Sequence, residues 1–208
     1  QSRWSEPSYV YKRHVQMVRE SDRAWHAGKS SWFGRTDINS NSVGIEIVNP
    51  GHSLGYPGFP RRQIDAVIEL CAGIVQRHSI AAQRVLAHSD VAPGRKVDPG
   101  EKFPWKTLFA AGIGHLVPAA PVRRGTALKT GDTGSDVEAL QSMLALYGYG
   151  AEISGTFDRQ TEIVVEAFQR HFRPRLVDGA ADGSTLRTLQ RLVASVKAIP
   201  AKKSFSRR

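Results

Sequence analysis

One stretch of the chain, residues 85–100, limits most strongly what this sequence can form. It begins with a short apolar run that is typical of a buried strand, and it continues into a loop rich in proline and glycine. His88, Lys96 and Asp98 therefore lie at or just after a strand end, where α/β sheets usually keep their chemistry. The ordinary alternative is a solvated histidine followed by a common Asp-Pro-Gly turn.

The side chains of this stretch suit a metal site. His88 can supply an imidazole nitrogen and Asp98 a carboxylate oxygen, and Zn2+ accepts such mixed ligands while keeping one position open for water. Lys96, two residues before Asp98, adds a positive charge where an oxyanion would develop. The spacing is therefore compatible with a zinc site around this loop, but by itself it favours the ordinary turn.

Residues 41–49 offer a candidate base. Their apolar and polar side chains alternate as in a strand, which places Ile45 and Ile47 on one face and Glu46 on the other. Gly44 shares the face of Glu46 and would leave space for a ligand. Taken alone, the strand favours the simpler interpretation of Glu46 as an ordinary carboxylate on the solvent side.

Three sequence strings together resemble one enzyme family. They are H-S-D-V-A-P-G-R-K-V-D-P-G at residues 88–100, S-V-G-I-E-I at 42–47 and A-W-H-A-G at 24–28. They are similar to the zinc-dependent N-acetylmuramoyl-L-alanine amidases, the amidase-2 group related to the peptidoglycan-recognition proteins. This resemblance implies an α/β domain with a mixed β-sheet flanked by helices, which we expect over residues 1–112.

The resemblance also implies a reaction and its residues. His88 and Asp98 would bind zinc, Glu46 would activate the zinc-bound water, and Lys96 would stabilise the transition state. The bond cut would be the amide between N-acetylmuramic acid and L-alanine, in peptidoglycan or in its fragments. The competing hypothesis is a non-catalytic peptidoglycan-binding protein with a degenerate amidase domain.

Non-periodic segments rich in Gly, Ser and Trp are expected to line the substrate groove. The residues predicted to bind substrate there are Trp25, His26, Arg35 and Asn41. For Trp25, a cap over the hydrophobic core is an equally good interpretation.

One feature departs from the family pattern. The family has a third zinc ligand, a histidine on an opening strand, and the matching string here is Glu6-Pro7-Ser8-Tyr9, which has no histidine. Because catalytic zinc sites usually have three protein ligands, two would hold the metal weakly. We expect that the first strand is not included in this chain. The alternatives are a degenerate domain, or a substitute ligand chosen among His14, His26 and His52.

The remaining pattern of the first domain predicts two helices and a hairpin. A helix is expected from Pro60 to about His78, with an apolar stripe that includes Cys71, and a shorter one from about 103 to 111. Short strands are expected at 9–11 and 15–18.

A second domain follows a linker rich in proline and glycine at 113–129. Three segments repeat glycine followed by Asp, Ser or Thr before an amphipathic run, which predicts a small all-α bundle of three helices over 130–196. Ser135 with Glu138, Asp158 and Asp182 are the predicted N-terminal caps. The strings D-V-E-A-L-Q, G-T-F-D-R-Q-T and A-F-Q resemble the peptidoglycan-binding domain of the PGBD type. Residues 197–208 read as a basic tail.

The charge composition of the chain limits the classes of molecule that it is expected to bind. The chain has 29 Lys and Arg against 19 Asp and Glu, a net charge of +10, which favours polyanions such as nucleic acid, anionic lipid or cell wall. No zinc finger or basic motif interleaved with aromatic residues supports nucleic acid, and no apolar run is long enough to span a membrane. Cys71 is the single cysteine, so no intramolecular disulfide can form. We expect a monomer that binds peptidoglycan or muropeptides in the cell envelope (the periplasm or the outer membrane), with a cytoplasmic location as the alternative.

Overall fold

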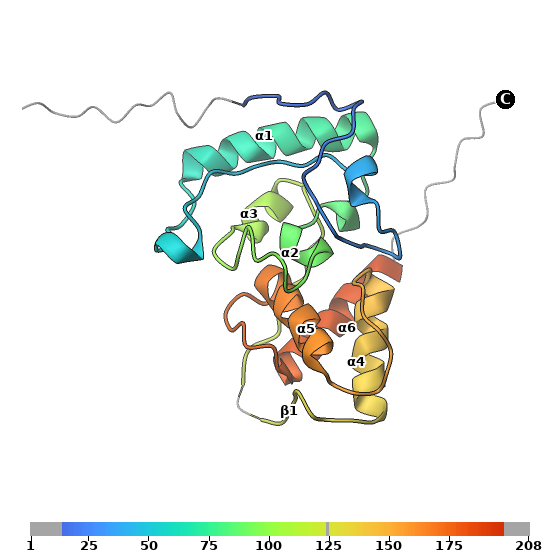
Figure 1. The fold of residues 1–208 in the computed structure, drawn as a ribbon. Helices are drawn as coiled ribbons and strands as arrows, with labels where there is room; N and C mark the ends of the chain where they lie inside the picture. The colour runs from blue at the N-terminus through green and yellow to red at the C-terminus, as the bar shows by residue number, and fades with distance from the viewer. Residues whose placement is uncertain (1–13, 124, 198–208) are drawn as a thin grey trace, which may run out of the picture. The chain divides into compact units, whose positions relative to one another are not determined.

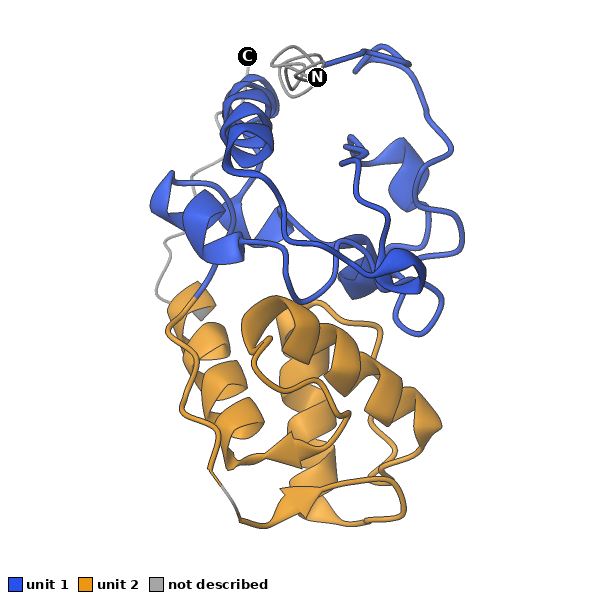
Figure 2. Cartoon of the chain, turned by 90° about the vertical axis from the view of Figure 1, so that its left-hand side faces the viewer, with its two compact units in different colours: residues 1–116 blue, residues 117–208 orange. Residues whose placement is uncertain are grey.

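The computed structural model describes residues 14–123 and 125–197, without the side chain of Lys197. The chain divides into two compact units, residues 1–116 and 117–208 (Figure 2). The boundary between the units falls inside the stretch 113–129, whose composition predicts a linker. The predicted strand at 9–11 and the predicted basic tail lie outside the described residues, apart from the backbone of Lys197.

Unit 1 is organised around one long helix, α1 (Arg61–His78), which begins directly after Pro60 (Figure 1). Its position confirms the helix predicted from the sequence. The buried stripe of α1 consists of Ile64, Val67, Cys71 and Ile74. Three residues of this stripe, Ile64, Val67 and Cys71, pack into one hydrophobic cluster with the aromatic and aliphatic side chains of Phe103, Trp105 and Leu108. Burial raises the pKa of the Cys71 thiol, as expected for a side chain that serves as a small hydrophobic residue in this core.

The other helices in the described residues of unit 1 are short. They are η2 (Ile38–Ser40), η3 (His52–Leu54), η4 (Ala82–Arg84), α2 (His88–Val91) and α3 (Trp105–Ala110). Helix α3 confirms the second predicted helix. His88 is the first residue of α2, whereas the sequence predicted a position at or just after the end of a strand. The Asp90 carboxylate accepts the Ala87 amide at 2.8 Å, and this local hydrogen bond favours a helical turn where the sequence predicted an irregular loop.

The predicted strands of unit 1 are extended segments without a ladder partner among the described residues. Residues 15–18, 43–48 and 85–87 carry no strand assignment, and the only β-bridge of the described part of unit 1 joins Trp32 and Arg35. An extended segment becomes a strand only when a neighbouring backbone supplies hydrogen bonds, and no described segment lies beside 43–48 in that way. The mixed sheet is therefore not formed within the described residues.

The alternation predicted for residues 43–48 is nevertheless confirmed. Ile45 and Ile47 are partly buried and pack on the hydrophobic cluster of α1, whereas Glu46 and Val48 are exposed. Gln63 on α1 donates its side-chain amide to the Val48 carbonyl at 2.7 Å, which ties the segment to the helix. This attachment gives Glu46 a defined side of the segment from which to project.

The carboxylate of Glu20, which contacts the last residues of α1, makes the stability of unit 1 sensitive to acid. Glu20 accepts hydrogen bonds from Arg77 at 3.1 Å and lies 2.6 Å from His78 Nε2, and these bonds lower the pKa of Glu20 from 4.5 to about 2. A carboxyl group whose pKa is lower in the folded state stabilises the fold above pH 4.5 and loses that contribution as the pH falls toward 2.

We therefore expect Glu20→Gln to lower the melting temperature of unit 1 at pH 6, and the difference from wild type to vanish near pH 2. The four tryptophans all lie in unit 1, so tryptophan fluorescence follows this unit selectively. Asp22→Asn, at a carboxylate whose side chain contacts Ser21, is the matched control and should show no such pH dependence. A difference for Glu20→Gln that stays constant from pH 6 to pH 2 would contradict the assignment.

Unit 2 is the predicted bundle of three helices, α4 (Ser135–Tyr147), α5 (Arg159–Phe172) and α6 (Gly183–Lys197). Its buried aromatic side chains include Phe157, Phe168 and Phe172. Strands β1 (Ala127–Leu128) and β2 (Ala181–Asp182) pair antiparallel and form the one sheet of the described residues. A short β-bridge between Thr133 and Thr156 joins the segment before α4 to the segment before α5.

Two buried glutamines give unit 2 an internal repeat. Gln141 on α4 accepts the amides of Ser154 and Gly155 at 3.0 and 2.9 Å and donates to the Thr156 carbonyl and to Thr161. Gln169 on α5 lies 28 residues after Gln141 and makes the same set of bonds to a loop whose residues lie 24 positions after those held by Gln141. Its partners are the amides of Asp178 and Gly179, the Ala180 carbonyl and Thr185.

The helix caps follow the same repeat. Asp158 accepts the Thr161 amide at 2.8 Å and Asp182 accepts the Thr185 amide at 2.7 Å, which confirms both predicted caps. The capping box predicted for Ser135 and Glu138 is wrong. The cap of α4 is Gly134, at φ 116°, so Ser135 is already helical and makes no capping bond. A backbone angle in this region favours glycine over any residue with a Cβ.

Candidate active site

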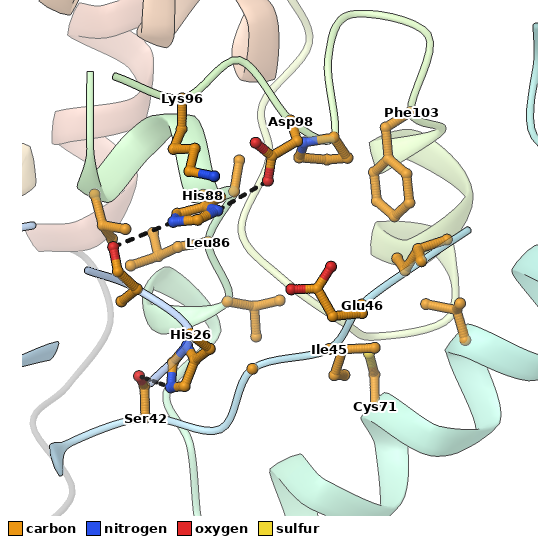
Figure 3. Close-up of a pocket in the computed structure, with 18 of the residues that line it drawn as sticks. His26, Ser42, Ile45, Glu46, Cys71, Leu86, His88, Lys96, Asp98 and Phe103 are labelled. Carbon is orange, nitrogen blue, oxygen red and sulfur yellow. Dashed lines mark hydrogen bonds and ion pairs between the residues drawn. The ribbon is translucent and has the colours of Figure 1, made fainter. Parts of the chain in front are cut away.

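A cavity of about 840 Å³ in unit 1 brings together the four residues predicted to carry the chemistry. Glu46 enters from the extended segment, His88 from the start of α2, and Lys96 and Asp98 from the loop that follows α2. In Figure 3 the Glu46 carboxylate, the Asp98 carboxylate and the His88 ring lie around one space, with the Lys96 ammonium group beside His88. Residues 50 positions apart in the sequence thus share one site.

His88 is oriented by a bond on each ring nitrogen. Its Nε2 donates to the Ala27 carbonyl at 3.2 Å, and its Nδ1 lies 2.9 Å from Asp98 Oδ2. Arg95 also donates to the Ala27 carbonyl, and its Nε donates to Lys29 O at 3.0 Å. A carbonyl oxygen and a carboxylate both only accept, so each ring nitrogen makes its hydrogen bond when it carries a proton, and Nδ1 is the nitrogen that faces the Asp98 carboxylate.

Asp98 is held in its charged form. The hydrogen bond with His88 lowers the pKa of Asp98, with a smaller contribution from the positive charge of Lys96, while burial acts in the opposite direction. Its side chain is 58 % exposed, so the carboxylate is open to a ligand in the cavity.

The space beside Gly44 is occupied by a side chain of the protein. A Cβ at Gly44 would lie 2.6 Å from Cγ of His26, so this glycine makes room for the His26 ring. The sequence had predicted space for a ligand at this position. His26 lines the cavity, and its Nε2 lies 3.3 Å from the Ser42 hydroxyl. The ring therefore lies between the A-W-H-A-G loop and the segment that carries Glu46.

The other residues predicted to bind substrate fall into two groups. Trp25 lines the cavity and is 80 % exposed, with the Arg23 guanidinium 4.1 Å from the centre of its ring, so it is not a cap on the core. Arg35 and Asn41 are exposed, are not part of the cavity lining, and bind one another at 3.1 Å.

Within residues 14–123 and 125–197, no group of three or more His, Cys, Asp or Glu side chains is arranged to hold a metal ion. Of the three histidines considered as substitute ligands, His26 and His52 line the same cavity as His88 and Asp98, but neither forms a metal-binding group with them. His26 contacts Ser42, His52 pairs with Glu101 at 3.0 Å, and His14 is exposed and does not line the cavity.

Sequence reasoning missed two residues that shape the site. Buried Asn39 accepts the amides of His26 and Ala27 at 3.1 and 2.8 Å, and so presents the Ala27 carbonyl to His88. Tyr56 is buried beside the loop after Asp98. A single asparagine or tyrosine in a non-periodic loop carries no local signal of such a role, and only its partners across the fold reveal it.

Comparison with known proteins identifies the family. The N-acetylmuramoyl-L-alanine amidase family Amidase_2 matches residues 9–101, and a putative peptidoglycan binding domain family, PG_binding_1, matches 133–189. The chain is 42 % identical to the N-acetylmuramoyl-L-alanine amidase AmiD of Escherichia coli K12 over 185 residues, which cover 86 % of this chain and 67 % of AmiD. The chain belongs to the N-acetylmuramoyl-L-alanine amidase family. It is an enzyme of the amidase class joined to a peptidoglycan-binding domain.

Solved structures of the family confirm the fold class. AmiD from E. coli, in complex with anhydro-N-acetylmuramic acid-L-Ala-D-γ-Glu-L-Lys, matches with a TM-score of 0.74 at 37 % identity, over 91 % of this chain and 76 % of that one. AmpDh3 from Pseudomonas aeruginosa matches with a TM-score of 0.72 at 34 % identity, over 88 % and 73 %.

More distant amidases match a smaller part. The 1,6-anhydro-N-acetylmuramyl-L-alanine amidase AmpD of Enterobacter cloacae is 34 % identical over 96 residues, which cover 46 % of this chain and 49 % of AmpD. The chain thus spans about two thirds of AmiD and half of AmpD. In the described part of the chain, no helix has both the length and the apolar character that a membrane crossing requires.

Proposed function

We propose that this protein hydrolyses the amide bond between N-acetylmuramic acid and L-alanine, in peptidoglycan or its fragments, with Zn2+ as cofactor. The observation that carries the proposal is the convergence of Glu46, His88, Lys96 and Asp98 on one cavity of unit 1. The relatives whose names state an amidase activity support the same reaction class.

The donor atoms of His88 and Asp98 fit zinc. An imidazole nitrogen and a carboxylate oxygen lie 2.9 Å apart at the cavity, and both are ligand types that Zn2+ accepts. The second nitrogen of His88 donates to a backbone carbonyl, which is the usual way in which proteins orient a metal-binding histidine. When bound, zinc supplies a Lewis acid that makes water nucleophilic near neutral pH.

The protein side chains divide the remaining work. Glu46 takes a proton from the attacking water and transfers it to the amine nitrogen of the leaving L-alanine. Lys96 places its ammonium group near the carbonyl oxygen as negative charge develops there. Trp25 and His26, at the cavity wall, contact the substrate. We assign Arg35 and Asn41, which lie outside the cavity lining, to contacts with the part of the substrate that extends beyond the cavity. Unit 2 binds the polymer and raises the local concentration of scissile bonds.

The cellular location that we propose follows from the peptidoglycan-binding role of unit 2. A domain that binds peptidoglycan acts where that polymer is present, so we place the protein in the cell envelope, associated with the periplasm or the outer membrane. We propose that it acts as a monomer, with peptidoglycan or muropeptides rather than nucleic acid as its partner.

The first test measures metal and turnover together. We expect the zinc-loaded protein to release stem peptides from purified peptidoglycan or from an anhydromuropeptide, and to retain about one zinc per chain after dialysis. His88→Ala should lose both the zinc and the turnover. His78→Ala, at the exposed C-terminal residue of α1 and outside the cavity lining, is the matched control and should keep both.

Two outcomes would contradict the proposal in different ways. Zinc retained in His88→Ala would remove His88 from the metal site. Wild-type protein that sediments with insoluble peptidoglycan but releases no peptide would favour a non-catalytic binding protein instead.

A further inference from the structure

A buried tyrosine of the cavity lining, Tyr56, is hydrogen-bonded to the turn that follows Asp98. Tyr56 is only 5 % exposed and follows η3, ten residues after Glu46 in the chain. Its hydroxyl donates to the Pro99 carbonyl at 2.6 Å and accepts the Lys102 amide at 2.9 Å. A single side chain thus bonds both ends of the turn that directly follows Asp98.

The turn is shaped to receive this hydroxyl. Gly100 adopts φ +85°, and a Cβ at this position would overlap the Tyr56 hydroxyl and lie 2.7 Å from Cζ of the ring. Any side chain at Gly100 would therefore both strain the backbone and displace Tyr56. The close approach indicates that the glycine and the tyrosine act as one packed unit.

A second layer holds the tyrosine ring itself. The His52 ring stacks on the Tyr56 ring with centroids 4.2 Å apart, and His52 Nε2 lies 3.0 Å from Glu101 Oε2. The Lys102 ammonium group donates to the Tyr56 carbonyl and lies 5.1 Å from the centre of the ring. The segment 52–56 and the turn 99–102 are therefore fastened at several points around Tyr56.

From this geometry we infer that Tyr56 is a positioning residue, whose hydroxyl fixes the loop carrying Asp98 relative to the segment carrying Glu46. The inference rests on the proposed function of those two carboxylates. Without the hydroxyl, the Pro99 carbonyl and the Lys102 amide lose their partner, and the turn is free to shift the neighbouring Asp98. Burial raises the pKa of Tyr56, so the hydroxyl keeps the proton that it donates.

Tyr56→Phe tests the inference because it removes the hydroxyl and keeps the ring. Tyr149→Phe, at a buried tyrosine of unit 2, is the matched control. The first readout is amide hydrogen exchange, in which residues 98–102 should exchange faster in Tyr56→Phe only. The second is zinc affinity, measured by competition with a chelating dye, and the third is kcat against KM for an anhydromuropeptide.

Loss of a group that orients a metal ligand typically costs about 10- to 100-fold in metal affinity or activity. We expect zinc affinity and kcat to fall by about that factor in Tyr56→Phe, with KM within about 3-fold of wild type. Gly100→Ala, which displaces the hydroxyl from the other side, should act in the same direction. If either variant fails to fold, hydrogen exchange of the Lys102 amide in the wild-type protein still tests the inference. The hydrogen bond from this amide to the Tyr56 hydroxyl requires slow exchange.

The outcomes separate this inference from the proposed function. Unchanged exchange at 98–102, or a rapidly exchanging Lys102 amide in the wild type, would overturn the inference whatever the activity. Faster exchange with unchanged zinc affinity and kcat would reduce Tyr56 to a purely structural residue. A wild-type protein that binds zinc without releasing peptide would contradict the proposed reaction, while the exchange and zinc results would still decide the role of Tyr56.

Discussion

Replacing Glu46 by Gln is expected to lower kcat for peptide release by about 10²- to 10⁴-fold, the range typical for loss of a general acid–base group. Glutamine matches the shape of the side chain but cannot accept the proton of the attacking water. Because Glu46 is exposed in the cavity and does not belong to the hydrophobic cluster beneath it, we expect the stability and zinc content to remain unchanged. Initial rates on an anhydromuropeptide, with products separated by chromatography, measure the effect.

The control for this variant is a carboxylate of the same type in the same unit. Glu69 is exposed on α1 and does not line the cavity, so Glu69→Gln should keep wild-type rates. A Glu46→Gln protein that retains more than about a third of the wild-type kcat would exclude Glu46 as the base.

Gln141→Leu is expected to cost unit 2 about 3 kcal/mol or more in free energy of unfolding. Leucine fills a similar volume but leaves the buried Gly155 amide and the buried Thr161 hydroxyl without the partner that Gln141 provides. The half-buried Ser154 amide loses its partner as well. Each buried polar group left unsatisfied costs about 1–3 kcal/mol, and the loss is a large part of the 5–15 kcal/mol that typically stabilises a domain.

Urea unfolding followed by two signals measures this loss. Far-UV circular dichroism reports the helices of both units, whereas the tryptophans report unit 1 alone. The midpoint should fall for the part of the dichroism transition that belongs to unit 2, and should stay constant by fluorescence.

The internal repeat supplies the comparison variants. Gln169→Leu should cost about as much as Gln141→Leu, because both side chains make the same set of bonds to equivalent loops. Gln190→Leu, at an exposed position of α6, should change stability by no more than about 0.5 kcal/mol. A Gln141→Leu effect as small as that of Gln190→Leu would contradict the role given to the buried amide.

The sequence predicted the helices because their signals are local. The stripe on α1 and the caps at Asp158 and Asp182 each depend on residues within a turn or two of one another, and the structure confirms all three. The capping box at Ser135 failed by one residue, because Gly134 could adopt the backbone conformation that ends the preceding loop. Element ends are decided by such small differences.

The strands were the weakest part of the prediction. Alternating side chains correctly predicted which face of residues 43–48 packs on α1. They could not predict a ladder, because hydrogen bonds between strands depend on a second segment far away in the sequence. Among the described residues, that partner is present for β1 and β2 alone.

What the sequence determined by itself was the residue types of the site and their spacing in strings such as H-S-D-V-A-P-G-R-K-V-D-P-G, together with the family that those strings resemble. Only the tertiary structure decided how the strings meet. It brought Glu46 into one cavity with His88, filled the space beside Gly44 with His26, and bonded Tyr56 to the turn after Asp98. The reason is physical: a motif records contacts between neighbours along the chain, whereas packing of α1 and its loops sets the distances between residues that the sequence keeps far apart.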